Sequence, residues 1–366
     1  MTVSALQIGI AGHFSSPADA VTRRAERAEA GGWDSVWWPD AQIGYHPAAP
    51  GEVDDPHEVY DWGPMIGASA VVTERVALGV SVTDPFRRHP GMLAQTAQTL
   101  HDLSHGRFIL GLGLGAIENL TPFGLEGSSK VAVLEEALDV MHLLWSTTEP
   151  VSIAGPTWSL DRAVLGVDST VHGAPPVWIG GTGPRSLDLT GRKADGWIPV
   201  MPALEDFRSK WALVVEGAER AGRDPSAVTA GCLFLTVAGE DLEALDRMLD
   251  TPWVRALALS QPASQFERLG EAHPLGELGS GMRGFVPTHW SLSDYRDLVA
   301  RIPLHVVKEL VLWGDGARLA DQLSAYANAG LEHAVIWNAT GMGMPSTEEV
   351  RSSFRAIEDA RARLCG

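Results

Sequence analysis

The residues best suited to bind an anion lie in the stretch GGTGP, Gly180–Pro184. Gly181 and Gly183 leave backbone N–H groups open to a ligand, and the hydroxyl of Thr182 adds another donor. Pro184 is suited to begin a helix, whose N-terminus would present the positive end of its dipole to the loop. The stretch predicts a phosphate site, although a tight structural turn uses the same residue types.

Three glycines alternate along another apolar run, RFILGLGLG, at Gly111, Gly113 and Gly115. They do not spell the G-x-G-x-x-G fingerprint of dinucleotide-binding proteins. Residues without a side chain let a planar ligand approach the backbone closely. Serine hydrolysis and P-loop phosphoryl transfer are disfavoured because their motifs are missing. His101 and His105 have metal-ligand spacing but no evident third ligand, so we predict no metal site.

Eight apolar strands, most of them followed by a helix, position these residues. This pattern predicts an α/β protein with a single (β/α)8 TIM barrel domain over residues 1–366, whose chemistry gathers at the carboxyl ends of the strands. A doubly wound sheet is the alternative, and the missing dinucleotide motif disfavours it. The expected strands are 6–11, 35–40, 76–82, 107–114, 176–180, 196–200, 229–237 and 333–337, with a strand-like turn at 309–313. The expected helices are 17–30, 64–72, 91–103, 130–145, one from Pro184, 204–221, 242–257, 317–329 and 347–364.

Three insertions interrupt this repeat at the C-terminal face of the strands, at about 41–61, 149–174 and 260–294. The second is expected to be irregular or a hairpin. The first and third are rich in Pro, Gly and His, and long loops of this kind are commonly binding segments. We predict that these two form the substrate entrance and become less mobile when ligands bind.

Composition excludes several classes of partner. A formal net charge of −18 disfavours binding to nucleic acid or to an anionic membrane surface. No apolar run is long enough to insert in a membrane, and the first residues lack the pattern of a signal peptide. Cys232 and Cys365 are the only cysteines, which gives no disulfide framework. A cytoplasmic enzyme acting on a small molecule is therefore expected.

Five motifs in order resemble the bacterial-luciferase-like flavin and deazaflavin oxidoreductases over nearly the whole chain. They are AERAEAGGWDSVWWPD, LGVSVTDPFRRHP, HGRFILGLGLG, PVWIGGTGPRSLDLTGRKADGWI and YANAGLEHAVIW. Within that family the chain is most similar to the branch that uses the deazaflavin coenzyme F420, especially ketone reductases of long-chain lipid biosynthesis. The resemblance implies F420, or alternatively FMN, as cofactor, and a homodimer.

The resemblance also implies where the cofactor lies. The ring would rest on a non-proline cis peptide at Ser81–Val82, next to Thr83, and Asp40 would lie near its redox-active part. Without the resemblance, Asp40 could equally cap a solvent loop. Further implied cofactor contacts are Gly115, Asn119, Gly181, Thr182 and Gly183.

Two positions depart from the deazaflavin pattern. Ala41 follows Asp40 where many members have histidine, and Ala116 stands where a glutamate is common. Another group, or water, must then supply the proton that accompanies hydride transfer. We expect His13, just beyond the first strand, or His289 in the third insertion, because histidine titrates near neutral pH. Either side chain could instead only hydrogen-bond the substrate or pack in a loop. His13→Ala or His289→Ala is then expected to slow the chemical step by ~10²-fold or more.

Three functions remain open on these grounds. The first is hydride transfer between F420 and an apolar carbonyl, imine or activated alkene. The second is an FMN-dependent monooxygenase, and the third is a non-catalytic flavin-binding member of the family. Tryptophans near strand ends or in the third insertion supply candidates for an apolar pocket wall. They are Trp37, Trp38, Trp178, Trp197, Trp290 and Trp337.

Overall fold

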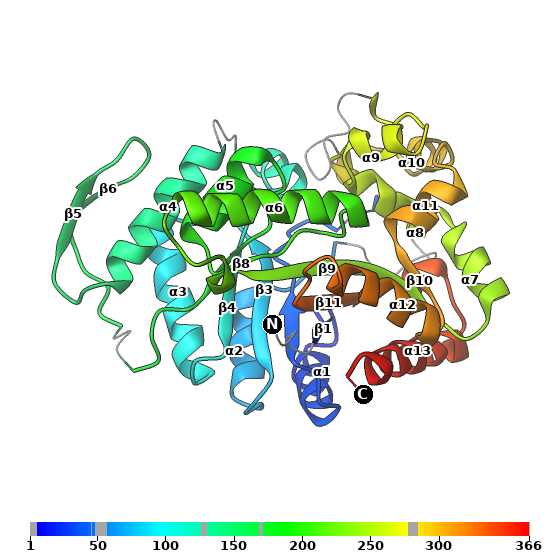
Figure 1. Cartoon of the computed structure of the whole chain (residues 1–366), viewed down its shortest axis with the longest axis horizontal. Coiled ribbons are helices and arrows are strands. Elements are labelled where there is room, and N and C mark those ends of the chain that lie inside the picture. The colour runs from blue at the N-terminus through cyan, green and yellow to red at the C-terminus, as the bar shows by residue number, and fades with distance from the viewer. Residues whose placement is uncertain are drawn as a thin grey trace.

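Eight parallel strands close into a barrel in the computed structural model, which describes residues 6–44, 46–47, 57–125, 130–167, 171–276 and 285–365. The ring closes because β9 pairs with both β8 and β11 (Figure 1). The predicted (β/α)8 barrel is therefore confirmed. Its strands are β1 (Gln7–Ala11), β2 (Ser35–Trp38), β3 (Ala77–Thr83), β4 (Phe108–Leu112), β7 (Val177–Ile179), β8 (Gly196–Trp197), β9 (Thr229–Ala238) and β11 (His333–Asn338).

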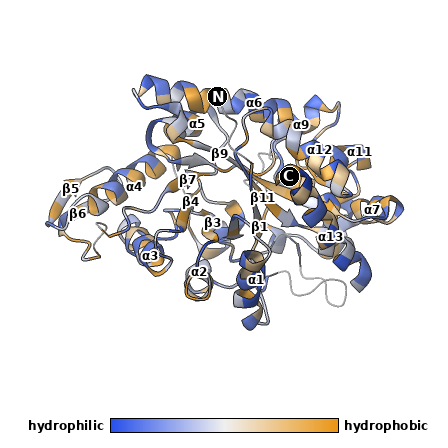
Figure 2. Ribbon diagram, turned by 60° about the horizontal axis from the view of Figure 1, so that its bottom comes forward, coloured by the Kyte–Doolittle hydropathy of each residue, from blue (hydrophilic) through white to orange (hydrophobic). Residues whose placement is uncertain are grey.

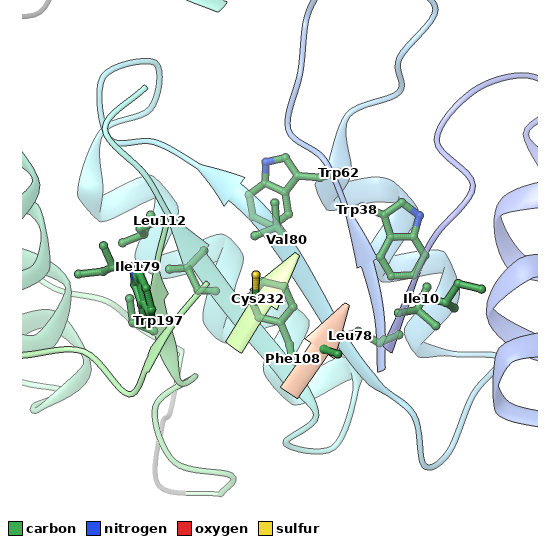
Figure 3. Packing of buried hydrophobic residues seen from close by; sticks show 14 of the residues in the cluster. Ile10, Trp38, Trp62, Leu78, Val80, Phe108, Leu112, Ile179, Trp197 and Cys232 are labelled. Atoms are coloured by element: carbon green, nitrogen blue, oxygen red, sulfur yellow. The ribbon is translucent and has the colours of Figure 1, made fainter. Parts of the chain in front are cut away.

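Helices surround the barrel and turn their apolar faces toward it (Figure 2). Side chains alternate between two environments along each strand. Those that point outward, such as Val36 and Trp38 of β2, pack under the helices in one large hydrophobic cluster (Figure 3). The surrounding helices are α1 (Asp19–Ala30), α2 (Trp62–Ala70), α3 (Pro90–Leu103), α4 (Lys130–Trp145), α5 (Pro184–Lys193), α6 (Leu204–Arg220), α12 (Gly316–Ala327) and α13 (Thr347–Cys365).

Two tryptophans and a histidine fill part of the barrel interior. The rings of Trp37 and Trp178 lie 5.3 Å apart, and that of His333 lies 5.3 Å from Trp178. Glycines make room for these rings: a Cβ on Gly79 would lie 2.3 Å from the ring of Trp37, and one on Gly231 would lie 2.7 Å from that of Trp178. These two tryptophans therefore serve the core rather than a pocket.

His333 is held neutral inside this core. Its Nδ1 donates to Oε1 of Gln7 at 3.0 Å, which leaves Nε2 to accept from the hydroxyl of Ser35 at 2.6 Å. Burial lowers the pKa of His333 from 6.5 to about 4. Between these values the unfolded chain takes up a proton that the folded chain does not, so stability falls as the pH falls.

Replacing His333 by glutamine should remove this source of acid sensitivity. The loss of unfolding free energy between pH 7 and pH 5 is expected to shrink by about 2 kcal/mol. Denaturant unfolding at the two pH values measures it. His289→Gln, at an exposed position, is the control variant for the same measurement. An equal pH dependence in wild type and His333→Gln would contradict the assignment.

Prolines explain two differences from the predicted elements. The expected helix over 242–257 ends at Leu249, and α8 (Pro252–Arg255) starts anew with Thr251 as its N-cap, because Pro252 cannot donate a backbone hydrogen bond. The expected strand 196–200 pairs continuously only over Gly196–Trp197, followed by a single bridge at Val200. Pro199 lies between them.

The expected insertion at 149–174 contains a hairpin of β5 (Val151–Ala154) and β6 (Ser159–Ala163), which lies at one end of the molecule (Figure 1). The third insertion is larger and more helical than the expected 260–294, because it spans everything between β9 and β10 (Leu312–Gly314). Its short helices share a hydrophobic cluster with the barrel interior. Helices of this length are too short for a hydrophobic periodicity to predict them from the sequence. They are α7 (Leu242–Leu249), α8, η4 (Ala256–Ser260), α9 (Ala263–Arg268), η6 (Pro287–His289), α10 (Leu292–Val299) and α11 (Leu304–Leu310).

Candidate active site

A cavity opens at the carboxyl ends of the strands, where the sequence predicts the chemistry. It receives residues from the ends of β2, β3, β4 and β7, and from the insertion that follows β9. Seven of the predicted site residues line it together. They are Asp40, Ser81, Val82, Gly115, Asn119, Gly181 and Thr182.

The floor of this cavity is a bulge in β3. The Ser81–Val82 peptide is cis, as the resemblance predicts, and the register with β4 shifts between Val80 and Thr83. A Cβ on Gly113 would lie 2.5 Å from Cγ2 of Val82. Gly111 in β4 and Gly113 just after it therefore make room for the bulge, which leaves Ser81 and Val82 facing the cavity. Thr83 is fully buried beneath them and does not line the cavity.

Asp40 is anchored by a buried arginine. Arg87 donates from Nη1 to Oδ1 at 3.1 Å and from Nη2 to Oδ2 at 2.8 Å, while its Nε donates to Asp84 at 2.7 Å. Burial alone would lower the pKa of Arg87, but Asp40 and Asp84 raise it above its ordinary value. The side chain of Asp40 is therefore held in one position at the cavity wall.

The loop after β4 is tied to the loop after β2. Asn119 accepts a hydrogen bond from the backbone N–H of Gln42 at 2.8 Å and donates to the carbonyl of Asp40 at 3.4 Å. The loop turns at Gly115, whose φ of +71° favours glycine, and enters the short helix η1 (Ile117–Asn119). This turn brings Glu118 into the cavity wall.

The predicted anion loop forms the far end of the cavity. Gly183 is the N-cap of α5 and Pro184 its first residue, as expected, while Gly181 and Thr182 face the cavity. Gly183 itself does not line the cavity, nor does the exposed Arg185.

A lysine that sequence reasoning missed lines the same cavity. Its helix, α6, adjoins the anion loop through Trp197, whose Nε1 donates to the carbonyl of Gly181 and whose ring stacks on Phe207. Lys210 comes from α6, and its ammonium group lies 3.2 Å from Asp206. Asp206 also accepts a hydrogen bond from Gln265 of the insertion. Only an i,i+4 charge pair marks Lys210 in the sequence, and such pairs are common on exposed helices.

An apolar cavity adjoins the first one. Its walls come from β9, from η4 and from the segment after β11, and Trp337 is the tryptophan among them. The two cavities share Ser81, Glu118, Val200, Leu233 and Ser260. The remaining lining residues of the second cavity are Leu235, Ala256, Leu257, Leu259, Phe285, Pro287, Trp337, Ala339 and Met342.

Neither predicted proton donor lines either of these two cavities. His13 is half-buried, and its Nε2 lies 3.3 Å from the carbonyl of Ser16. His289 ends the short helix η6 and is exposed, although Pro287 of the same helix reaches the apolar cavity. Their catalytic role stays a prediction.

The loop after β2 contacts the insertion on the same face of the barrel. Nδ1 of His46 and the hydroxyl of Tyr295 are hydrogen-bonded at 2.5 Å, and the histidine ring lies 5.2 Å from that of Trp253. Burial lowers the pKa of His46 to about 4, so the contact is between neutral groups at neutral pH. Residues 45, 48–56 and 277–284 of the two predicted entrance segments lie outside the described residues.

This fold and site define an enzyme of the (β/α)8 class, with a ligand cavity at the carboxyl ends of the strands. The family model described as luciferase-like monooxygenase matches residues 2–333. The chain belongs to this family. In the part that the structure describes, no helix has the length and apolarity needed to cross a bilayer.

Two relatives are informative. The phthiodiolone/phenolphthiodiolone dimycocerosates ketoreductase of Mycobacterium tuberculosis is 33% identical over 284 residues, which cover 77% of this chain and 74% of the relative. The F420-dependent glucose-6-phosphate dehydrogenase of Nakamurella multipartita is 32% identical over 251 residues, covering 64% of this chain and 69% of the relative.

Solved structures share the fold. An F420-dependent secondary alcohol dehydrogenase, in complex with an F420–acetone adduct, matches with a TM-score of 0.77 at 23% identity, covering 98% of this chain and 99% of that one. The F420-dependent tetrahydromethanopterin reductase of Methanopyrus kandleri matches with a TM-score of 0.76 at 18% identity, covering 99% and 100%.

Proposed function

We propose that this enzyme transfers a hydride between coenzyme F420 and the carbonyl group of an apolar small molecule. The observation that carries the proposal is the pair of adjoining cavities, one with glycine and polar walls and the other with apolar walls. The ketoreductase relative, whose name specifies a ketone substrate, supports the same chemistry. An imine or activated alkene fits the apolar cavity as well.

The first cavity fits a deazaflavin. Its floor at Ser81 and Val82 is lined by backbone and small side chains, which suits a flat ring. Its far end combines the N-terminus of α5 with Lys210, which suits the anionic tail of F420. When bound, F420 supplies the hydride chemistry, and the protein residues hold it and exclude water.

The apolar cavity disfavours a phosphorylated sugar. Among its described lining residues there is no lysine, arginine or histidine, and Glu118 is the one acidic residue. A phosphate placed there would have no basic partner, which is costly in apolar surroundings. This lining supports ketone-type substrates over the sugar phosphate of the dehydrogenase relative.

Titration with F420 and with FMN tests the proposal. We expect F420 to bind tightly and FMN weakly. The change in absorbance or fluorescence of the cofactor measures binding. Lys210→Met should weaken F420 binding about 10-fold, because a charge-assisted contact to an anion contributes on the order of 1.5 kcal/mol. Lys308→Met is the matched control, since Lys308 forms a similar ion pair at 2.8 Å with Asp246 and does not line either cavity.

Tight FMN binding without affinity for F420 would instead favour the monooxygenase alternative, which the family description supports. No turnover with any hydride acceptor, despite cofactor binding, would favour a non-catalytic member.

We further propose that the enzyme forms a homodimer through α3 and its neighbours. Met92 and Leu103 are 64% and 44% exposed, and their spacing of three helical turns places them on one face of α3. Light scattering that finds only monomer at working concentration would contradict the homodimer. A cytoplasmic location stays a prediction.

A further inference from the structure

Glu118 lies at the junction of the two cavities. It is 3% exposed and lines both of them. The other four residues that line both cavities are two serines and two aliphatic residues. Among the described residues, Glu118 is therefore the one carboxyl group that faces both cavities. A reacting carbonyl must meet the cofactor at such a junction, because the hydride passes directly between the two molecules.

The remaining acids and histidines of the site have other positions. The carboxylate of Asp40 receives two hydrogen bonds from Arg87, and Asp40 lines only the first cavity. His13 and His289 line neither cavity. The hydroxyls of Ser81 and Ser260 could accompany a carbonyl oxygen, but serine hydroxyls are poor acids near neutral pH.

We propose that Glu118 exchanges the proton that accompanies hydride transfer at the substrate carbonyl. The inference rests on the proposed function and extends it by naming the acid. Carboxyl groups are common proton donors in active sites, and a positioned donor contributes roughly 10²–10⁴-fold to the rate.

The step balances as follows for ketone reduction. The carbonyl carbon gains a hydride from the reduced deazaflavin, and the π electron pair of the C=O bond moves to oxygen. The Glu118 carboxyl O–H bond breaks as its proton forms the new O–H bond. The ketone becomes an alcohol, and the oxidised deazaflavin releases its surplus proton to solvent. Glu118 is left as a carboxylate that solvent reprotonates. In the reverse direction Glu118 takes the proton from the alcohol.

Single-turnover reduction of 2-octanone and 2-decanone by the enzyme loaded with reduced F420 tests the proposal. Glu118→Gln and Glu118→Ala should each slow deazaflavin oxidation by ~10²-fold or more while the Kd of F420 changes less than about threefold. Formate buffer at mildly acidic pH should raise the rate of Glu118→Ala at least about tenfold, because formic acid can occupy the vacated space and donate the proton. Glu267→Gln, at an exposed position on α9, is the control.

The outcomes separate the two proposals. A wild type that binds F420 but reduces neither ketone would overturn the carbonyl function, and with it the role of Glu118. A wild type that reduces a ketone, with Glu118→Gln at the same rate, would overturn only the role of Glu118. Loss in both Glu118 variants without rescue by formate would assign Glu118 to positioning, not to proton exchange. A slower single turnover in His13→Ala or His289→Ala, with a normal rate in Glu118→Gln, would assign the proton donor to a histidine.

Discussion

Replacing Arg87 by methionine is expected to lower the free energy of unfolding by about 3–5 kcal/mol, because it leaves buried carboxylates without their counter-charge. The side chains of Arg87 and Asp40 are only 7% and 5% exposed, so solvent screens their attraction weakly. F420 binding should also weaken, because Asp40 and the loop of Asn119 form one hydrogen-bonded wall of the cavity. Denaturant unfolding and cofactor titration measure the two effects.

The neighbouring arginine provides the control. Arg88 is 29% exposed, lies 3.9 Å from Asp40 and pairs with the exposed Asp61 at 3.1 Å. Arg88→Met should therefore cost about 1 kcal/mol or less. Equal losses in the two methionine variants would show that burial of the Arg87 pair does not set its contribution.

Filling the apolar cavity should abolish most of the activity toward apolar ketones without affecting the cofactor. Ala256 is 8% exposed, has helical backbone angles and lines only the second cavity. An indole at this position would occupy space that the substrate needs. We expect Ala256→Trp to lower kcat/KM by about 10²-fold or more, since a displaced substrate reacts from a poor geometry.

Ala212→Trp is the matched substitution at an exposed helical position on α6, and it should retain wild-type kcat/KM. The Kd of F420 should stay within about twofold in Ala256→Trp, because Ala256 does not line the first cavity. Loss of both F420 binding and turnover would indicate misfolding instead of a blocked substrate cavity. Normal ketone turnover in Ala256→Trp would mean that the substrate lies outside this cavity.

Strand ends were the most predictable part of the site. Asp40, Ser81 and Gly181 all follow short apolar runs, and parallel strands of a closed barrel must bring such ends to one face. The resemblance added the cis peptide at Ser81–Val82, which no propensity indicates, since trans bonds are favoured at almost every such position.

Side chains from helices and insertions were less predictable. Lys210 is typical of an exposed helical residue, and its place beside the anion loop depends on how α6 crosses α5. The apolar cavity depends on η4 and on Phe285 and Pro287 at the start of η6, in a segment whose short helices have too few turns to show a period. His13 and His289 follow elements that were predicted near the face, but element position does not fix side-chain direction.

The way the chain leaves and re-enters the barrel at β9 has a consequence for how such enzymes diversify. β10 pairs with the last residues of β9, and the N–H of Gly239 donates to the carbonyl of Gly314 at 3.1 Å. The insertion therefore begins and ends at neighbouring backbone positions, so both of its ends are attached at one place on the barrel. Segments with adjacent ends can change in length or sequence with little strain on their host. The barrel can thus keep one cofactor cleft while the insertion that shapes the substrate cavity changes in length or sequence.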